Sequence, residues 1–290
     1  MSLYTSLIEP FVEFGFMRRA LVACFALSLG SAPIGIILVL RRMSLMGDAM
    51  SHAILPGAAI GFLVAGLSLW AMSLGGLVVG LFVALLAGAV SRITPLREDA
   101  SLAGFYLISL ALGVLLISMR GSNVDLLHVL FGSILAVDDA SLMLVAGITS
   151  LTLIALAIIY RPLIIECFDP AFLKTTLRGG SVFHTIFLML VVLNLVAGFQ
   201  ALGTLMAVGL MMLPALAARF WATQLEGLIA ISICIGFASG LIGLLASYNF
   251  DLPSGPAIIL TAGAFYCLSL VLGTRGSLRA KYFPGAHFHE

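Results

Sequence analysis

The sequence predicts an all-α, polytopic membrane protein, a helical bundle with about eight to nine transmembrane helices. The first observation behind this prediction is composition: of 290 residues, 62% are hydrophobic and only 9% are charged, with a mean hydropathy of +1.20. Such a chain cannot present a charged surface to water, so lipid must be its main solvent. The sequence contains no stretch that suggests a soluble domain. We therefore treat residues 1–290 as a single transmembrane domain.

The second observation is a series of nine apolar runs that approach or meet the roughly 17 to 20 residues needed to cross a bilayer. None of them contains Lys, Arg, Asp or Glu. They are Ala20–Leu40, Ala53–Trp70, Leu74–Val90, Leu102–Ser118, Leu142–Tyr160, Val182–Phe199, Ala201–Ala217, Leu228–Leu245 and Ala257–Leu272. The run Val124–Val137 is shorter and fits an interfacial or re-entrant helix.

The charged residues that flank these runs indicate orientation. Residues 1–17 carry acidic residues ahead of Arg18 and Arg19, the wrong order for a cleaved signal peptide, and we interpret them as an amphipathic interfacial segment. Cytoplasmic loops retain an excess of Lys and Arg. An external N-terminus places most of the basic residues inside, and it makes residues 275–290 a cytoplasmic tail.

Several classes of function are disfavoured. The net charge of +1 gives no basic stripe for nucleic acid, and the four cysteines are scattered singly. The sequence contains no GxxxxGK[ST] phosphate loop, HExxH helix or GxSxG turn, which argues against ATP hydrolysis and common hydrolase chemistry.

The most informative segment joins the first two predicted spans and reads LRRMSLMGDAMSHAILPG. Asp48 and His52 are four residues apart, so on a helix they lie one turn apart on the same face. This carboxylate and imidazole can reach one cation, and the pair suits zinc, manganese or ferrous iron, with further ligands from water, another segment or a second subunit. The alternative is that Asp48 caps the span and His52 lies at the interface. Pro56 and Gly57 predict a break here, and transporters often place ion sites in broken helices.

A second polar segment lies between the fifth and sixth predicted spans, where we expect a short cytoplasmic helix over residues 168–180. Asp169 as N-cap with Pro170 at the first helical position would begin it, and Gly179 with Gly180 would end it. Such a helix across the end of a bundle is suited to docking a partner, with an ordinary solvated loop helix as the alternative. His184, which opens the next span, is expected to be a hydrogen-bonded packing residue.

Four stretches resemble the permeases of the ABC-3 family of zinc, manganese and iron ABC transporters. They are Leu40–Gly57, Tyr160–Pro170 (YRPLIIECFDP), Gln200–Phe220 (QALGTLMAVGLMMLPALAARF) and Asp251–Ile259 (DLPSGPAII). They occur in the family's order over most of the chain. After Phe-Asp-Pro the family usually has an Ala-Arg-Ala-Leu-Gly-like turn, whereas this chain reads LKTTLRG. This departure bears on the identity of the ATPase subunit that the chain would bind.

The resemblance implies a permease that works as a dimer, with a second copy or a paralogue, around a central pathway in the bacterial inner (plasma) membrane. An external solute-binding protein would deliver Mn²⁺, Zn²⁺ or Fe²⁺ as the transported ion rather than a permanent cofactor, and separate cytoplasmic ABC ATPase subunits would hydrolyse ATP. It places the metal site at Asp48 and His52, where acid should weaken binding because neutral imidazole is the ligand form. It also implies ATPase docking by Phe168, Asp169, Pro170, Lys174, Arg178 and Gly179.

Two other classes of function compete with the permease. A stand-alone secondary transporter or channel would be expected to carry membrane-embedded carboxylates for coupling, and the nine predicted runs contain none. An intramembrane metalloenzyme would need a third ligand and a general base near Asp48 and His52. The sequence does not place either.

Overall fold

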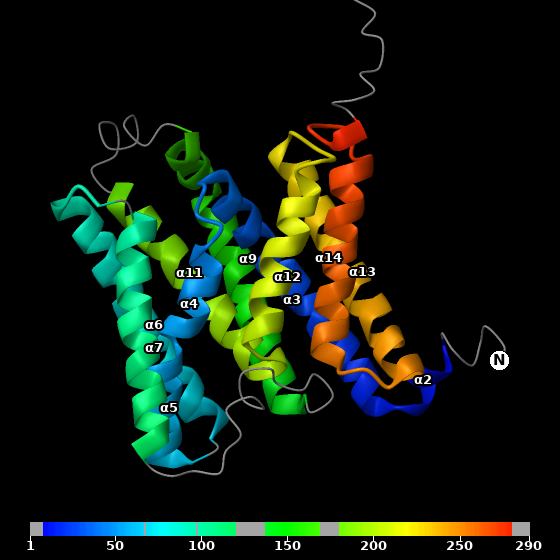
Figure 1. Ribbon diagram of the computed structural model, residues 1–290, viewed down its shortest axis with the longest axis horizontal. Helices are drawn as coiled ribbons and strands as arrows, with labels where there is room; N and C mark the ends of the chain where they lie inside the picture. Colours follow the sequence, from blue (N-terminus) through cyan, green and yellow to red (C-terminus); the bar gives the residue numbers. More distant parts are fainter. Residues whose placement is uncertain (1–7, 67, 97, 120–136, 169–179, 280–290) are drawn as a thin grey trace, which may run out of the picture.

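The structure, a computed structural model, describes residues 8–66, 68–96, 98–119, 137–168 and 180–279. Every regular element within these residues is a helix, which agrees with the predicted all-α class (Figure 1). The helices are α2 (Glu9–Glu13), α3 (Gly15–Leu40), α4 (Met46–Ala53), α5 (Leu55–Ala65), α6 (Leu69–Ile93), α7 (Glu98–Met119), α9 (Asp139–Phe168), α11 (Gly180–Leu202), α12 (Thr204–Ala218), α13 (Leu225–Phe250) and α14 (Ser254–Leu272).

The described residues contain eight stretches that are long and apolar enough to cross a membrane. The predicted run Ala201–Ala217 corresponds to α12, which has only 15 residues. At 1.5 Å per residue α12 spans about 22 Å, less than the roughly 30 Å of a hydrocarbon core. The prediction of a polytopic bundle with about eight to nine membrane helices is confirmed.

The second span differs from its predicted bounds. The sequence suggests Ala53–Trp70, whereas the observed span is Met46–Ala65. The segment that contains Asp48 is therefore part of the span and not a loop before it, because its polar residues lie on a helix whose other side is buried. At the far end Gly66 has φ of 65°, a left-handed conformation that ends α5 and reverses the chain.

The predicted break within this span is confirmed. Helix α4 ends at Ala53 and α5 begins at Leu55, with Pro56 in the first turn of α5. Proline has no N–H to donate to the preceding turn, so the helix cannot run through this point without losing a hydrogen bond. The broken span lies beside α7 and α11, and its α4 half lies deep in the bundle (Figure 1).

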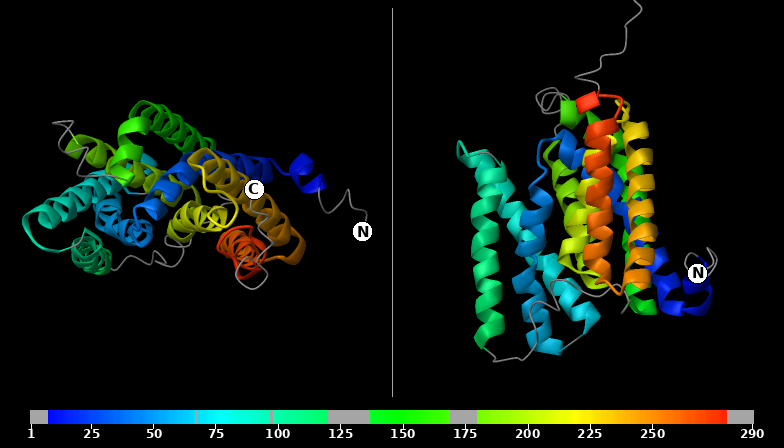
Figure 2. Two further views of the ribbon diagram at one scale, coloured as in Figure 1. Left: turned by 90° about the horizontal axis from the view of Figure 1, so that it is seen from above. Right: turned by 45° about the vertical axis from the view of Figure 1, so that its right-hand side comes forward.

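The helices form two groups that α4 and α11 connect, α11 by packing against α6. Helix α3 lies in the middle of the larger group and packs against α9, α12 and α13, while α5, α6 and α7 form the other side of the bundle (Figure 2). Within the second group α5 and α6 touch backbone to backbone, since a Cβ atom at Gly57 would lie 2.1 Å from the carbonyl oxygen of Gly75. Helix α4 packs against α7 on one side and against α11 and α12 on the other.

The N-terminal segment is described from residue 8 onward. Helix α2 ends at Glu13, Phe14 is extended, and α3 begins at Gly15, before the predicted start of the first span. Near the start of α3, Arg19 forms an ion pair with Asp139 of α9 at 3.2 Å. Helix α2 and the last described residues lie at opposite ends of the bundle (Figure 1). Of the predicted tail 275–290, residues 280–290 lie outside the described part.

Candidate metal site

Helix α4 presents Asp48 and His52 on one face. Six of its eight residues are buried: Met46, Gly47, Ala49, Met50, Ser51 and Ala53. The side chains of Asp48 and His52 are 64% and 32% exposed, and Asp48 Oδ1 lies 3.7 Å from His52 Nε2. The structure therefore brings the two predicted ligands together on the accessible side of an otherwise buried helix.

Asp48 does not cap α4, so this part of the alternative interpretation fails. The N-cap position is Leu45, and no side chain caps the helix; Asp48 lies within the first turn. Asp138, by contrast, does cap a helix: its Oδ1 accepts a hydrogen bond from the backbone N–H of Ser141 at 2.8 Å. Hydrogen bonds from the hydroxyl and N–H of Ser141 lower the pKa of Asp138.

The imidazole of His52 is under-bonded. Its Nδ1 atom is buried and has no hydrogen-bond partner among the described residues. Its Nε2 atom lies too far from Asp48 for a hydrogen bond of ordinary length. The ring of Tyr106 on α7 lies close by, with 6.3 Å between the ring centroids. Nδ1 is enclosed by protein, so Nε2, the nitrogen nearest Asp48, is the one that could hold a cation.

Two ligands do not complete a coordination shell. No group of three or more His, Cys, Asp and Glu side chains with metal-binding geometry occurs among the described residues. The remaining ligands of a cation at Asp48 and His52 would come from water, from a second subunit or from parts of the chain that the structure does not describe.

The predicted docking residues lie mostly outside the described part of the chain. Phe168 is the last residue of α9, and Gly180 is the first residue of α11. Asp169, Pro170, Lys174, Arg178 and Gly179 fall in the interval between them. Their proposed role stays a prediction.

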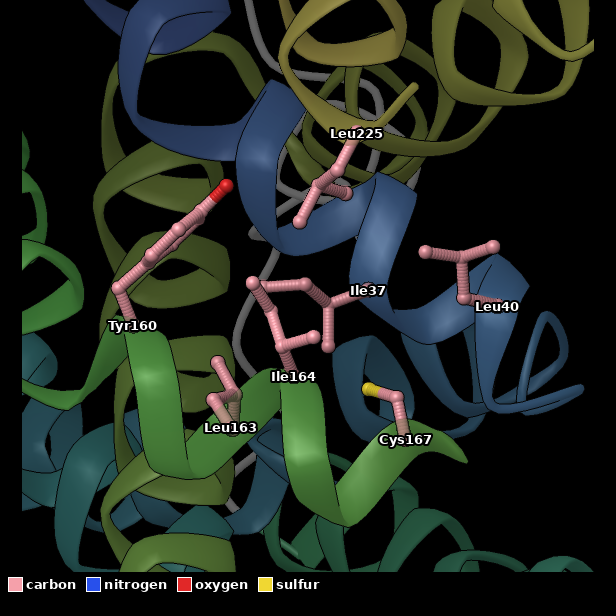
Figure 3. A pocket seen from close by; sticks show the side chains of 7 residues that line it. All are labelled: Ile37, Leu40, Tyr160, Leu163, Ile164, Cys167 and Leu225. Carbon is pink, nitrogen blue, oxygen red and sulfur yellow. The ribbon is translucent and has the colours of Figure 1, made fainter. Parts of the chain in front are cut away.

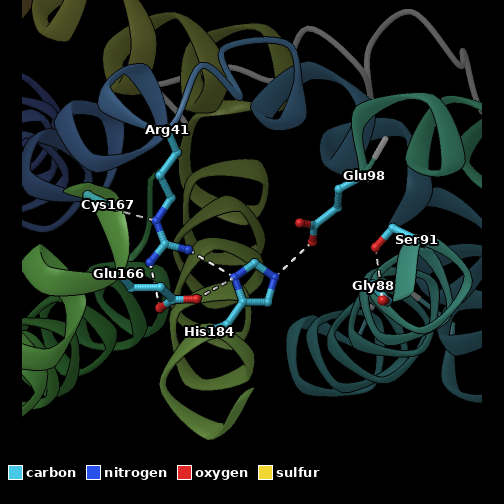
Figure 4. Close-up of polar contacts among 7 residues, drawn as sticks. All are labelled: Arg41, Gly88, Ser91, Glu98, Glu166, Cys167 and His184. Atoms are coloured by element: carbon cyan, nitrogen blue, oxygen red, sulfur yellow. Dashed lines mark hydrogen bonds and ion pairs between the residues drawn. The ribbon is translucent and has the colours of Figure 1, made fainter. Parts of the chain in front are cut away.

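The structure also reveals a charged cluster that the sequence did not identify as a unit. Four side chains from α7, α9, α11 and the C-cap of α3 meet around His184 (Figure 4). The guanidinium of Arg41 donates to Glu166 at 2.8 Å and to His184 Nδ1 at 2.9 Å, and His184 Nε2 lies 2.8 Å from Glu98 Oε1. We call these residues, Arg41, Glu98, Glu166 and His184, the His184 cluster.

Every bonding direction of His184 is used. His184 Nδ1 lies 2.9 Å from the guanidinium of Arg41 and 3.4 Å from Glu166 Oε1, and Nε2 lies 2.8 Å from Glu98 Oε1. A neutral ring accepts from Arg41 at Nδ1 and donates to Glu98 from Nε2, whereas a protonated ring donates to both carboxylates. Arg41 also lies 4.7 Å from the ring centroid of Phe187, a cation–π contact. The expectation that His184 is a hydrogen-bonded packing residue is confirmed. The one sequence signal for the cluster is that its members all lie at or near helix ends.

An apolar pocket borders this cluster but is no candidate for a cation site. It lies between α3, α9 and the start of α13, with a volume of about 10 Å³, barely enough for one water molecule (Figure 3). It is lined by Ile37, Leu40, Tyr160, Leu163, Ile164, Cys167 and Leu225. Its lining contains no carboxylate or imidazole. A larger hollow of about 200 Å³ is lined by Ala84, Leu85, Gly88, Ala89, His184, Thr185 and Leu188, but both ring nitrogens of His184 are already bonded within the cluster. The Asp48–His52 face therefore remains the candidate site.

A bundle of membrane-length helices with ionisable side chains in a broken span is typical of membrane transport proteins. The chain belongs to the ABC 3 transport family, whose family model matches residues 13–273. Within that family it is a permease subunit, the membrane-spanning component of an ABC transporter.

Relatives match along nearly the whole chain. The manganese import system permease protein ScaB of Streptococcus parasanguinis is 31% identical over 271 residues, which cover 93% of this chain and 95% of ScaB. The manganese transport system membrane protein MntC of Halalkalibacterium halodurans is 31% identical over 291 residues, covering 100% and 98% of the two chains. The solved structure of PsaBC from Streptococcus pneumoniae in complex with Fab superposes with a TM-score of 0.84 at 30% identity, covering 97% of this chain and 100% of that one.

Proposed function

We propose that this permease subunit imports a divalent transition metal into the cytoplasm and that Asp48 and His52 are its transient ligands. The single observation that carries the proposal is the open pair on α4: a carboxylate and an under-bonded imidazole 3.7 Å apart in a broken membrane span. Mn²⁺ is the first ion to test because ScaB and MntC are manganese permeases by name. Zn²⁺ and Fe²⁺ accept the same ligand types.

The exposure of Asp48 supports a pathway between two subunits. A carboxylate at membrane depth is costly when it faces lipid, and such groups face a bundle interior or a water-filled cavity. In the single chain 64% of the Asp48 side chain is exposed. A second permease copy, or a close paralogue, placed against this face of α4 would enclose the site and could supply the missing ligands.

The energy source is proposed to be ATP hydrolysed by separate cytoplasmic subunits. Residues 168–180, between α9 and α11, are the proposed docking segment for these ATPases. In this arrangement the N-terminus is external, the tail 275–290 is cytoplasmic, and a solute-binding protein delivers the ion from outside at the inner (plasma) membrane. ATP binding and hydrolysis would alternate the dimer between outward-facing and inward-facing states, with Asp48 and His52 holding the ion between them.

The alternative of a secondary transporter driven by an ion gradient must be reconsidered. The sequence disfavoured this class because no predicted run contained a carboxylate, but Asp48 lies within the span Met46–Ala65. Family membership now separates the two classes, since the chain belongs to the ABC 3 transport family. The two mechanisms make opposite predictions when the partner ATPase is inactivated.

The test is metal accumulation in cells that express the chain with its candidate ATPase and solute-binding protein. We expect wild type to accumulate Mn²⁺, and Asp48→Ala and His52→Ala to lose this uptake at matched protein level. Asp138→Ala is the matched control, because it removes a carboxylate that only caps a helix. Wild-type uptake by both site variants would contradict the site assignment. Uptake that persists with a catalytically inactive ATPase would contradict the ATP-driven mechanism.

A further inference from the structure

Helix α7 lies directly against the break between α4 and α5. Three of its residues, Tyr106, Ser109 and Gly113, have helical spacing that places them on one face. Each contacts a successive feature of the broken span. The ring of Tyr106 lies beside that of His52 in a tilted arrangement, the hydroxyl of Ser109 donates to the backbone of Ala53, and Gly113 lies against Pro56.

The contact of Ser109 is the most specific of the three. Its hydroxyl donates to the carbonyl oxygen of Ala53 at 2.9 Å. Ala53 is the last residue of α4 and is fully buried, and Ser109 is only 6% exposed. A backbone carbonyl beside a helix break in a dry interior needs a donor from elsewhere, and the hydroxyl of Ser109 provides it.

Six other serines on the described membrane helices make a different hydrogen bond. The hydroxyl of a serine in a helix commonly donates a hydrogen bond to the backbone carbonyl four residues earlier. This is seen for Ser28, Ser31, Ser118, Ser150, Ser239 and Ser269. Ser109 instead bonds a residue 56 positions away on another helix. Its hydroxyl therefore makes a tertiary contact rather than a local one.

The approach of α7 to the break depends on the absence of a side chain at Gly113. A Cβ atom there would lie 3.0 Å from the backbone nitrogen of Pro56 and 3.3 Å from its Cδ atom. Glu98, at the start of the same helix, is held by His184. Helix α7 is thus fixed at its start by His184. Its middle packs against the broken span at Ala53, the residue that follows His52.

We propose that Ser109 is a positioning residue for the metal site: by bonding the carbonyl of Ala53 it fixes the end of α4, and with it the orientation of His52 relative to Asp48. This inference rests on the proposed function, because it assigns a role toward the same ligand pair. Groups that orient metal ligands typically change metal affinity or activity by about 10- to 100-fold when they are removed. Ser109 orients its ligand through the backbone.

The experiment measures Mn²⁺ uptake by the complete transporter as a function of Mn²⁺ concentration. Ser109→Ala is expected to raise the half-saturating concentration about 10-fold, at the low end of that range, with the maximal rate per permease molecule retained. Ser109→Thr keeps the hydroxyl and is expected to restore the wild-type value. Ser109→Cys keeps the volume with a weak donor and should fall between them. Ser118→Ala, on the same helix, removes a local hydrogen bond and serves as the matched control.

A wild-type half-saturating concentration in Ser109→Ala or Ser109→Cys would overturn the proposal. A Ser109→Thr variant that behaves like Ser109→Ala would also overturn it, because the effect would then come from packing and not from the hydroxyl. Asp48→Ala, measured alongside, separates this inference from the proposed function. If Asp48→Ala is inactive and Ser109→Ala is normal, only the positioning role fails. If Asp48→Ala transports normally, the proposed function itself fails.

Discussion

Two histidines in the described part of the chain lie beside carboxylates, and their surroundings are opposite. His184 is held by Glu98 at 2.8 Å and by the guanidinium of Arg41 at 2.9 Å, and its side chain is only 12% exposed. His52 lies 3.7 Å from Asp48, and its Nδ1 atom has no partner within the described part of the chain. The same two residue types therefore form a saturated cluster in one place and an open pair in the other.

The difference separates stability from function. In the His184 cluster each charge is paired by neighbours from other helices, so the cluster joins α3, α7, α9 and α11 and has no free valence for a cation. Asp48 and His52 both lie on α4, so their pair links no two helices, and its carboxylate and Nε2 atom can bind a ligand. A substitution in the cluster should reduce stability, whereas a substitution at the open pair should remove function and leave stability almost unchanged.

The largest loss of stability is expected for Arg41→Ala. Removing one partner of a buried ion pair typically costs 3 to 5 kcal/mol, because the other charge stays buried without compensation. The side chains of Arg41 and Glu166 are 8% and 15% exposed, so we expect a cost of about 3 kcal/mol, at the low end of this range. The free energy of unfolding of the purified permease, measured by titration of detergent micelles with a denaturing surfactant, checks this value.

Arg42→Ala is the matched control for this prediction, because Arg42 is the exposed neighbour of Arg41. A loss of less than about 0.5 kcal/mol is expected for this surface change. Equal stabilities of Arg41→Ala and Arg42→Ala would contradict the structural role of the His184 cluster.

A smaller effect is expected for Asp138→Ala, which removes the N-cap of α9. Loss of a capping side chain typically costs about 1 kcal/mol. The lowered pKa of Asp138 means that its contribution to stability is present above the unfolded-state pKa of about 3.9 and is lost as the pH falls through the folded-state value. The difference in unfolding free energy between wild type and Asp138→Ala should therefore shrink below about pH 4. A difference that grows in acid would contradict this assignment.

The smallest effect on stability is expected for Asp48→Ala. Asp48 caps nothing, and the one polar side-chain contact that it makes in the described chain is the long pair with His52. We expect a change of less than about 0.5 kcal/mol in the free energy of unfolding, the range for surface substitutions. A loss as large as that of Arg41→Ala would mean that Asp48 is a structural residue, and the contrast between the two pairs would disappear.

Local features of the sequence predicted the open pair but not the saturated cluster. The spacing of Asp48 and His52 fixes their shared face on any helix, and Pro56 fixes the break, so both were correct before the fold was known. The bounds of the second span were wrong because Asp48 resembles a loop residue in a hydropathy profile. The bonds of His184 depend on how four helices pack, and no local spacing encodes that arrangement.

The most direct test of the account is equilibrium binding of Mn²⁺ to the purified permease in complex with its ATPase partner, followed by the loss of the electron paramagnetic resonance signal of hydrated Mn²⁺. Wild type and Arg42→Ala are expected to bind the ion, and Asp48→Asn with His52→Gln is expected to lose binding while it remains folded. Binding by the double variant with wild-type affinity would contradict the central claim that the open pair on α4 is the metal site.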